Sequence, residues 1–375
     1  MTFSKPISSY TATPSMTIST EQENTIYWVM LTASLFIVIW LIWIVDQMAN
    51  VGKKNHESLE DRMKHLEHNP TPSGVLDNTK PVVMRLDGRK FSKLTKSLKS
   101  REHPYNVTLS ACLVNCVGDL MNEFGADVGY TQSDEISLVW YPHEVRSPAD
   151  EPTLYKELIF GGRVQKLCSV VAAYCTARFN HYVQNPSECK ISQMMVGRGI
   201  EYFDIQNDLK FSNRTPHFDA RIWNMPSEQE VLNYFIWRSK HDSVRNSISG
   251  LAQRYFSPKK LHYVTVDEQL RMLKQEHNID WDDSLLSIHK YGAFVKKELV
   301  EKGRGENGNP ILRSGNMAFQ ITFDDIREPL NRVIILDLLR SKYVENNHVE
   351  FLGKTESKDL GESEEAEESE ESSTC

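Results

Sequence analysis

The segment PVVMRLDGRKFSKL, residues 81–94, decides the fold. It opens with an apolar run that contains two valines and alternates with longer side chains up to Asp87, where Gly88 interrupts it. Valine-rich runs that end at glycine are typical of β-strands followed by a turn. The sequence therefore predicts a strand that carries the carboxylate of Asp87 at its tip.

A second segment, VGYTQSDEISLVW at residues 128–140, lies some forty residues further along the chain. Residues 128–131 and 136–141 predict two strands. The polar residues between them, Gln132 to Glu135, predict the hairpin that joins these strands. If this hairpin pairs with the first strand, Asp87 and the hairpin acids project from one edge of one sheet.

Two acidic groups on one rigid edge, Asp87 and the Asp134/Glu135 couple, suit a pair of hard cations. Mg²⁺ takes few protein carboxylates and completes its coordination with phosphate oxygens and water. This pattern indicates a palm-type nucleotidyl transferase. The alternative is a solvated hairpin tip next to an unrelated aspartate at a strand end.

The remaining pattern predicts an α+β fold, a polymerase- or cyclase-like palm whose largely antiparallel sheet is covered by helices. Helices are expected over residues 91–98, 107–124, 154–183 and 228–256, and strands over 218–223, 293–299 and 317–323. The expected organisation is a disordered N-terminus (1–23), a transmembrane helix (24–47), a linker (48–74), the catalytic palm (75–260), a C-terminal region of the same catalytic unit (261–345) and an acidic disordered tail (346–375).

Residues 26–45 form a run of twenty uncharged, mostly apolar residues. A helix of that length spans a bilayer core of roughly 30 Å. A cleaved signal peptide is the alternative, but its apolar region is usually shorter and preceded by basic residues. Lys53, Lys54, Arg62 and Lys64 follow the run, whereas only Lys5 precedes it, so the positive-inside rule places the catalytic body in the cytosol. We therefore expect a single-pass membrane protein.

The chain of 375 residues has a net charge of −8, most of which comes from nine acidic residues and two lysines in residues 354–375. The rest of the chain is nearly neutral, so any surface that binds nucleic acid must be locally basic. The six cysteines lack the CxxC spacing of a zinc site and lie mostly in apolar helical patterns. We expect buried, reduced thiols.

Four motifs together resemble the tRNA-histidine guanylyltransferase family of 3′ to 5′ polymerases: RLDGRKF (85–91), YTQSDEISLVW (130–140), FDARIW (218–223) and NYFIWR (233–238). The resemblance covers roughly residues 80–300. It implies a palm enzyme that uses nucleoside triphosphates, with ATP and GTP as substrates, to add guanosine or templated nucleotides to the 5′ end of tRNA or a similar RNA. Members of the family are dimers or tetramers, so the resemblance also implies a homo-oligomer.

The resemblance assigns roles to individual residues. Asp87 and Asp134 would hold two Mg²⁺ ions with the carbonyl of Gly88, and Glu135 would support them in catalysis. The nucleotide would be contacted by Gly88, Arg89, Lys90, Phe91, Ser92 and Ser133, and its triphosphate by Arg163 and Lys166. Backbone N–H groups at a helix start suit a triphosphate. Without the family context, Arg163 and Lys166 would form a solvated helix face.

The chain departs from the eukaryotic members at the segment that recognises tRNA. Those members carry His-Ile-Asn-Asn shortly after the Trp-Arg pair, whereas this chain has Ser-Val-Arg-Asn at residues 243–246. In this respect it is similar to bacterial, archaeal and viral relatives. Arg238, Arg245 and Asn246 are the predicted RNA contacts, since arginine suits phosphate. The alternative for Asn246 is a polar residue on an exposed helix.

Two other functions fit parts of the sequence. A membrane-anchored nucleotide cyclase would use the same two-metal palm, but the Gly-Gly-Asp-Glu-Phe hairpin of such enzymes is absent. A catalytically inactive RNA-binding or scaffold protein would not need the acids at positions 87, 134 and 135. The cyclase would form a cyclic nucleotide without RNA, whereas the inactive protein would form no product.

The first prediction concerns the membrane segment. Residues 26–45 are expected to keep the protein in the membrane fraction through a carbonate wash, with the catalytic body protected from protease added outside intact cells. Fractionation and protease protection measure both outcomes. A soluble protein, or one glycosylated at Asn106 or Asn213, would contradict this topology.

Overall fold

The computed structural model describes residues 58–68, 74–91, 105–145, 153–189, 215–305, 307–321, 323 and 326–344. The predicted disordered N-terminus, membrane segment and acidic tail lie outside these residues, as does the predicted nucleotide contact Ser92. Within the described residues, no helix is both long and apolar enough to cross a membrane. The chain divides into two units, residues 1–58 and 59–375, and the elements below belong to the second.

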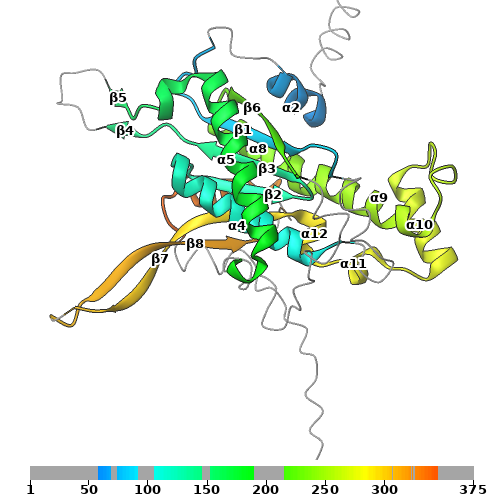
Figure 1. Cartoon of the computed structure of the whole chain (residues 1–375). Coiled ribbons are helices and arrows are strands. Elements are labelled where there is room, and N and C mark those ends of the chain that lie inside the picture. The colour runs from blue at the N-terminus through cyan, green and yellow to red at the C-terminus, as the bar shows by residue number, and fades with distance from the viewer. Residues whose placement is uncertain are drawn as a thin grey trace, which may run out of the picture. The chain divides into compact units, whose positions relative to one another are not determined.

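The second unit is built on one six-stranded sheet (Figure 1). In spatial order its strands are β6 (Phe218–Asn224), β1 (Val82–Gly88), β3 (Glu135–Trp140), β2 (Val128–Gln132), β7 (Ala293–Arg304) and β8 (Pro310–Phe319). Every neighbouring pair is antiparallel. The prediction of a largely antiparallel sheet is therefore confirmed. The strand predicted over residues 317–323 begins earlier, because β8 starts at Pro310 and ends at Phe319. A separate ribbon pairs β4 (Glu144–Val145) with β5 (Leu154–Tyr155).

One face of the sheet packs against helices α4 (Val107–Phe124) and α5 (Val164–Gln184). Strand residues that point to this face alternate with those that do not: Val82, Met84 and Leu86 belong to this core, whereas Val83 belongs to the core of the other face. Helix α4 begins where the side chain of Asn106 accepts a hydrogen bond from the backbone N–H of Leu109 (3.0 Å).

The predicted buried thiols lie between α4 and α5. Cys112 faces Cys189 across 3.9 Å, and Cys116 faces Cys175 across 3.8 Å, measured between sulfur atoms. All four are free and buried, while Cys168 is partly exposed. The prediction of buried thiols is confirmed for four of the five described cysteines, and their reduced state remains a prediction.

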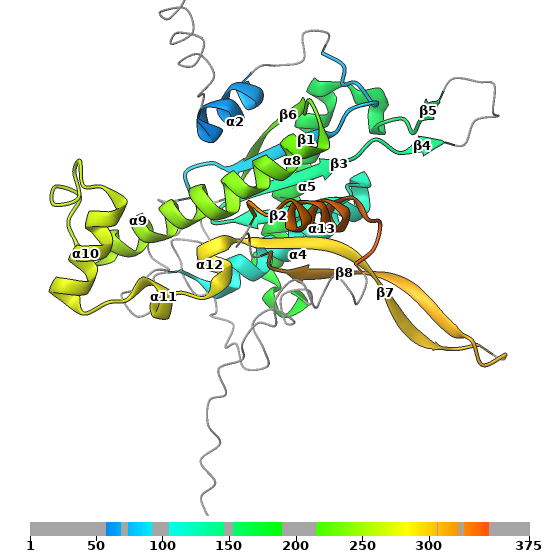
Figure 2. The same ribbon diagram turned by 180° about the vertical axis from the view of Figure 1, so that it is seen from behind.

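The opposite face of the sheet is covered by α8 (Glu228–Ile236), α13 (Pro329–Arg340) and α2 (Leu59–His68) (Figure 2). Met63 of α2 is fully buried in this second core. The predicted boundary at residue 75 is therefore too late, because residues 59–68 were assigned to a linker and instead form a packed helix. The weak apolar pattern of this helix explains the error, since its buried residues include the charged Glu67.

The helix predicted to start at residue 154 starts ten residues later. Phe160, Gly161 and Gly162 all have positive φ angles, of 56°, 60° and 68°. This backbone conformation is incompatible with a right-handed helix, and two of the three residues are glycines that adopt it readily. The chain therefore forms a short 3₁₀ turn (Ile159–Gly162) before α5 begins.

The helix predicted over residues 228–256 is present as three consecutive helical segments. Helix α8 runs into a π-helical segment (Trp237–Ser243) and then into α9 (Val244–Tyr255). Helix α9 continues into a small lobe formed by α10 (Val266–His277), α11 (Trp281–Ser284) and α12 (Ser287–Tyr291). The lobe has its own apolar cluster, which includes Leu251, Phe256 and Leu273.

A buried lysine joins β7 to the end of α13. The ammonium of Lys296 donates to the carbonyl oxygens of Asp127 (3.2 Å), Leu339 (2.8 Å) and Ser341 (2.6 Å). The last carbonyls of a helix have no hydrogen-bond partners within the helix, and a cation at this end interacts favourably with the helix dipole. Lys296 thus fixes α13 on the sheet.

Replacing Lys296 with Met is expected to lower the free energy of unfolding by about 1–3 kcal/mol, because buried carbonyls lose their donor. Burial lowers the pKa of Lys296 to about 7 from its ordinary 10.5. Between these pH values the unfolded chain binds more protons than the folded chain, so wild-type stability rises with pH and the gap between wild type and variant widens. Urea unfolding near pH 7 and near pH 9 measures the gap. If the difference in stability between wild type and variant narrows as the pH rises, the pKa of Lys296 is not lowered in the folded chain.

Candidate active site at the ends of three strands

The acidic edge of the sheet is formed where β1 ends beside the β2/β3 hairpin. Asp87 lies opposite Glu135 in the antiparallel register of β1 and β3. The backbone N–H of Gly88 donates to the carbonyl oxygen of Asp134 (3.0 Å). The prediction that Asp87 and the two hairpin acids share one edge is therefore confirmed.

The hairpin tip is a tight two-residue loop in a strained conformation. Ser133 has a φ angle of 51°, which is uncommon for a residue with a side chain. Its hydroxyl donates to the carboxylate of Asp134 (3.1 Å) and so restrains this acid. Lys90, on the other side of the edge, has a φ angle of 60°. Strain of this kind is held by surrounding structure and tends to gather at functional sites.

Gly88 is required by the close approach of Phe91. A Cβ atom at position 88 would lie 2.5 Å from the ring of Phe91. That ring packs against Phe179 and Phe218, with centroid distances of 5.4 Å and 5.2 Å, so it cannot easily move away. The turn after Asp87 is therefore fixed by an aromatic cluster beneath it.

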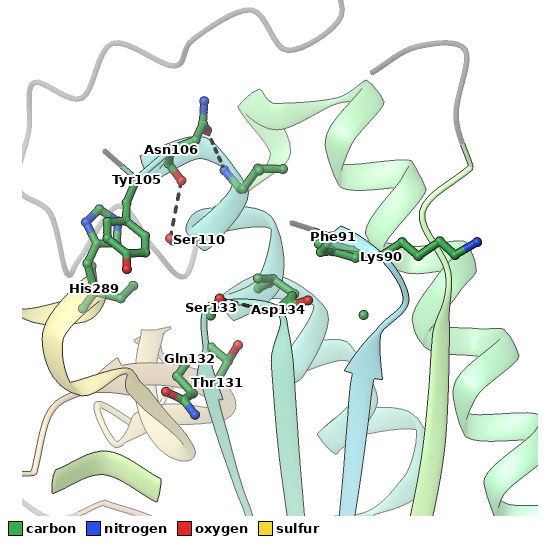
Figure 3. A pocket seen from close by; sticks show the side chains of 14 residues that line it. Lys90, Phe91, Tyr105, Asn106, Ser110, Thr131, Gln132, Ser133, Asp134 and His289 are labelled. Atoms are coloured by element: carbon green, nitrogen blue, oxygen red, sulfur yellow. Dashed lines mark hydrogen bonds between the residues drawn. The ribbon is translucent and has the colours of Figure 1, made fainter. Parts of the chain in front are cut away.

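A cavity of about 230 Å³ opens beside this edge (Figure 3). It brings together predicted nucleotide contacts from two parts of the chain, Gly88, Lys90 and Phe91 from the turn after β1 and Ser133 from the hairpin, together with Asp134. Its other walls come from residues that the sequence motifs did not single out: Tyr105, Asn106, Leu109, Ser110, Leu113, Thr131, Gln132, Ile288 and His289. Arg89 is exposed and does not line it.

An aromatic pair forms one rim of the cavity. The rings of Tyr105 and His289 are stacked, with centroids 5.1 Å apart and planes at 22°. The hydroxyl of Tyr105 donates to the backbone carbonyls of Asn246 and Ser247 in α9, each at 3.2 Å. Burial raises the pKa of Tyr105, so the phenol keeps the proton that it donates. A Cβ atom at Gly250 would lie 2.2 Å from this hydroxyl, so α9 can approach only because residue 250 is glycine.

Gln132 contributes a polar group to the cavity wall. Its side-chain nitrogen donates to Asp242 (2.9 Å), while its side-chain oxygen is buried and accepts no hydrogen bond from the described residues. An unsatisfied buried acceptor is costly unless a ligand or water supplies a donor. Because this oxygen is enclosed by protein atoms, it stays unsatisfied within the described part of the chain.

The structure does not present Arg238 to RNA, contrary to the prediction. Its side chain is only 3% exposed and is bonded to the carboxylates of Glu67 (3.2 Å), Glu135 (2.9 Å) and Asp242 (2.9 Å). Burial raises the pKa of Glu135, and the charge of Arg238 acts in the opposite direction. The charge of Arg238 therefore favours the ionised form of Glu135 against the effect of burial. Local sequence could not predict this role, because Glu67 lies 171 residues from Arg238 along the chain.

In a single copy of the chain, Arg163 and Lys166 lie far from the acidic edge. Arg163 caps the first turn of α5, whereas Phe179 of the same helix packs on Phe91 beside the cavity. Sixteen residues of helix separate Arg163 from Phe179, a distance of roughly 24 Å along the axis. The two basic residues lie instead around Phe160: Arg163 donates to its carbonyl (3.1 Å), and Lys166 lies over its ring. Neither of them lines the cavity beside the acidic edge.

Arg245 and Asn246 are exposed on α9 next to the aromatic rim. Arg245 pairs with Asp242 and, at 3.5 Å, with Glu60, but half of its side chain remains accessible. Their predicted contact with RNA agrees with this exposure. A further acid that the sequence reading did not select, Asp219, lies opposite Asp87 on the outer strand β6 and is exposed.

The edge fits Mg²⁺ by the chemistry of its donors. The side chain of Asp87 is 35% exposed, Asp134 lines the cavity, and the Gly88 backbone lies between them. Among the described residues no cluster of three or more acidic, histidine or cysteine side chains is arranged to enclose an ion. Mg²⁺ does not need such a cage, because it binds through one or two carboxylates and fills its shell with water and phosphate oxygens. Asp87, Asp134 and the Gly88 carbonyl are the groups that would hold it.

Comparisons with known proteins agree with the motifs. A sequence profile described as tRNAHis guanylyltransferase matches residues 60–226. An uncharacterised protein of Acanthamoeba polyphaga mimivirus is 32% identical over 277 residues, which is 73% of this chain and 88% of the viral protein. A probable tRNA(His) guanylyltransferase of Dictyostelium discoideum is 24% identical over 242 residues, 60% of this chain and 79% of that protein.

Solved structures are also similar. A bacterial tRNA(His) guanylyltransferase-like protein in complex with ATP is 28% identical with a TM-score of 0.49, covering 74% of this chain and 98% of that chain. The tRNA(His) guanylyltransferase of Saccharomyces cerevisiae is 18% identical with a TM-score of 0.43, covering 68% of this chain and 94% of that chain.

Replacing Asp87 or Asp134 with Asn is expected to weaken the binding of Mn²⁺, used as a probe for Mg²⁺, by at least about tenfold, because each change removes a charged oxygen ligand. The unfolding temperature should change little, since neither side chain is buried. Calorimetric titration with Mn²⁺ and thermal unfolding measure the two effects. Asp267→Asn, an exposed acid at the start of α10, is the control and should bind Mn²⁺ like the wild type. Unchanged binding in both test variants would remove the metal assignment.

Proposed function

The chain belongs to the tRNAHis guanylyltransferase family, and we propose that it restores nucleotides at the 5′ end of tRNA or tRNA-like RNA by templated 3′ to 5′ addition. As a nucleotidyltransferase of this family it uses nucleoside triphosphates. The observation that carries the proposal is the convergence of Asp87, Gly88 and Asp134 beside the cavity. Neither a cyclase nor an inactive scaffold accounts for both the family and this intact edge.

The residues at the edge divide the work of phosphoryl transfer. Asp87, Asp134 and the Gly88 carbonyl would hold Mg²⁺, with Glu135 behind them. When bound, Mg²⁺ lowers the pKa of an attacking hydroxyl and neutralises charge on the leaving pyrophosphate. The turn after β1 binds and orients the phosphates through the exposed side chain of Lys90.

The cavity is smaller than the typical ligand pocket of about 300–1,000 Å³. A complete nucleoside triphosphate therefore extends beyond it, and we assign the cavity to the base and ribose, with the phosphates along the acidic edge. Phe91, Tyr105 and His289 offer aromatic surfaces for the base.

The RNA is positioned by α9. Arg245 and Asn246 are exposed beside the cavity rim. Arginine binds phosphate without reading a base, so this segment holds the RNA end rather than selecting one anticodon. The absence of histidine from residues 243–246 supports this division.

The same proposal includes the location of the enzyme. Residues 26–45 would anchor it as a single-pass protein with the catalytic body in the cytosol, where tRNA is available. The expected homo-oligomer remains a prediction from the family.

We predict that the enzyme adds the missing first nucleotide to several truncated tRNAs, with the identity of the nucleotide set by the opposite strand. The reason is that Ser243 is short and uncharged and Arg245 contacts phosphate, so neither supplies anticodon recognition. The full-length chain is incubated with all four nucleoside triphosphates and Mg²⁺, and the labelled products are sequenced. Transfer RNA-histidine and another tRNA lacking its first nucleotide are compared.

The control is the Asp87→Asn variant, which should add nothing to either RNA. Efficient guanosine addition to tRNA-histidine that depends on its anticodon, with no addition to the truncated tRNA, would falsify the proposed templated activity. A cyclic nucleotide formed without RNA would favour the cyclase.

A further inference from the structure

A buried carboxylate on α2 accepts hydrogen bonds from three arginines. The side chain of Glu67 is only 2% exposed. Arg85 of β1 reaches one of its oxygens at 2.8 Å, Arg221 of β6 reaches the same oxygen at 2.9 Å, and Arg238 reaches the other at 3.2 Å. Nothing in the sequence motifs marks Glu67, because it precedes the first strand and lies in a segment predicted to be a linker.

Two of these arginines each hold one of the candidate catalytic acids. Arg85 uses its other terminal nitrogen to bind Asp87 (3.1 Å). Arg238 uses its other terminal nitrogen to bind Glu135 (2.9 Å) and Asp242 (2.9 Å). One arginine therefore connects Glu67 to Asp87, and a second arginine connects Glu67 to Glu135.

The geometry follows from the strand register. Arg85 and Asp87 are two residues apart on β1, so they point to the same face, and Asp87 lies opposite Glu135. Helix α2 packs on that face through Met63, which brings Glu67 over the strands. Arg238 reaches the same point from the π-helical segment. Three separate parts of the chain therefore meet at one carboxylate.

We propose that Glu67 is a positioning residue for the metal site: it holds Arg85 and Arg238 so that they orient Asp87 and Glu135 without neutralising them. The inference rests on the proposed function, which gives the acidic edge its role in binding metal. The test does not depend on that function, because it measures metal binding alone. An arginine that faces a single carboxylate competes with a cation for that carboxylate. Arg85 divides its charge between two acids and Arg238 between three, and Glu67 is one of them in both cases. This sharing leaves Asp87 and Glu135 with negative charge for Mg²⁺.

Loss of Glu67 has a predictable direction. Arg238 stays buried, with only Glu135 and Asp242 left as carboxylate partners, and Arg85 keeps only Asp87. A buried charge that loses a partner strengthens its remaining contacts. The arginines then bind the acids of the edge more tightly, and a divalent cation binds less well.

The test compares Glu67→Gln with Glu60→Gln in the full-length chain, solubilised in mild detergent. Both residues are on α2, but Glu60 is exposed and pairs with Lys64 and Arg245 outside the edge. Calorimetric titration with Mn²⁺ alone measures the dissociation constant of the metal. We expect Glu67→Gln to raise it about tenfold, a loss of electrostatic free energy within the range of one partly buried charge, and Glu60→Gln to leave it unchanged.

Two further variants separate positioning from folding. Arg221→Gln removes a contact to Glu67 that reaches neither Asp87 nor Glu135, so it should lower the unfolding temperature without changing the Mn²⁺ dissociation constant. If Glu67→Gln does not fold, Glu67→Asp takes its place: it keeps the charge but is too short to hold all three arginines, and must weaken Mn²⁺ binding by a smaller factor. RNA binding, measured without nucleotide, should be equal in the wild type and in folded Glu67→Gln and Arg221→Gln chains.

A folded Glu67→Gln chain that binds Mn²⁺ like the wild type would overturn the inference, as would an equal effect of Glu60→Gln. If Arg221→Gln weakens Mn²⁺ binding as much as Glu67→Gln does, Glu67 acts only through packing. Because Mn²⁺ binding is measured without RNA or nucleotide, failure of nucleotide addition by the wild type would refute the proposed function separately.

Discussion

The antiparallel pairing of β1 with β3 is the constraint on which the site depends. It places Asp87 opposite Glu135 and lets the N–H of Gly88 bind the carbonyl of Asp134. Side chains alternate between the two faces of a strand, so a shift of one residue would exchange the apolar and polar faces of β1 along its length. That shift would bury Arg85 and Asp87 against α4 and α5. The apolar core on the α4/α5 face therefore holds the register, and through the register it holds the acids.

The sequence alone was sufficient to predict the elements whose signals are local. The strands around Asp87 and Asp134 have their own apolar patterns and turn residues, and α4 has its own capping residue, so these elements and the shared acidic edge could be predicted. The cavity walls could not, because Tyr105 and His289 stack only after α9 and α12 have been brought to the edge. No local pattern encodes a contact between residues so far apart in the chain.

Charge was the most misleading signal. A guanidinium near a family motif, as in Arg238, suggests an RNA contact, but its surroundings convert it into a buried support for Glu135. The converse error concerned Glu67: a charged helix was assigned to a linker, although its carboxylate is buried among arginines. In both cases the partner residue, rather than the residue itself, determines the role. The break before α5, by contrast, follows from Gly161 and Gly162, and the pattern of apolar residues concealed it.

The contact between Glu67 and Arg238 spans 171 residues of chain, which has a consequence for the order of folding. Closing so long a loop costs more chain entropy than pairing β2 with β3 across two residues, so the hairpin forms readily and the long-range contact forms late. During synthesis, all the acids of the edge emerge well before Arg238 does. A chain that has folded only as far as β3 therefore carries the carboxylates without their full set of arginines. The acidic edge reaches its final charge balance only when the helices of the second face have docked, late in folding.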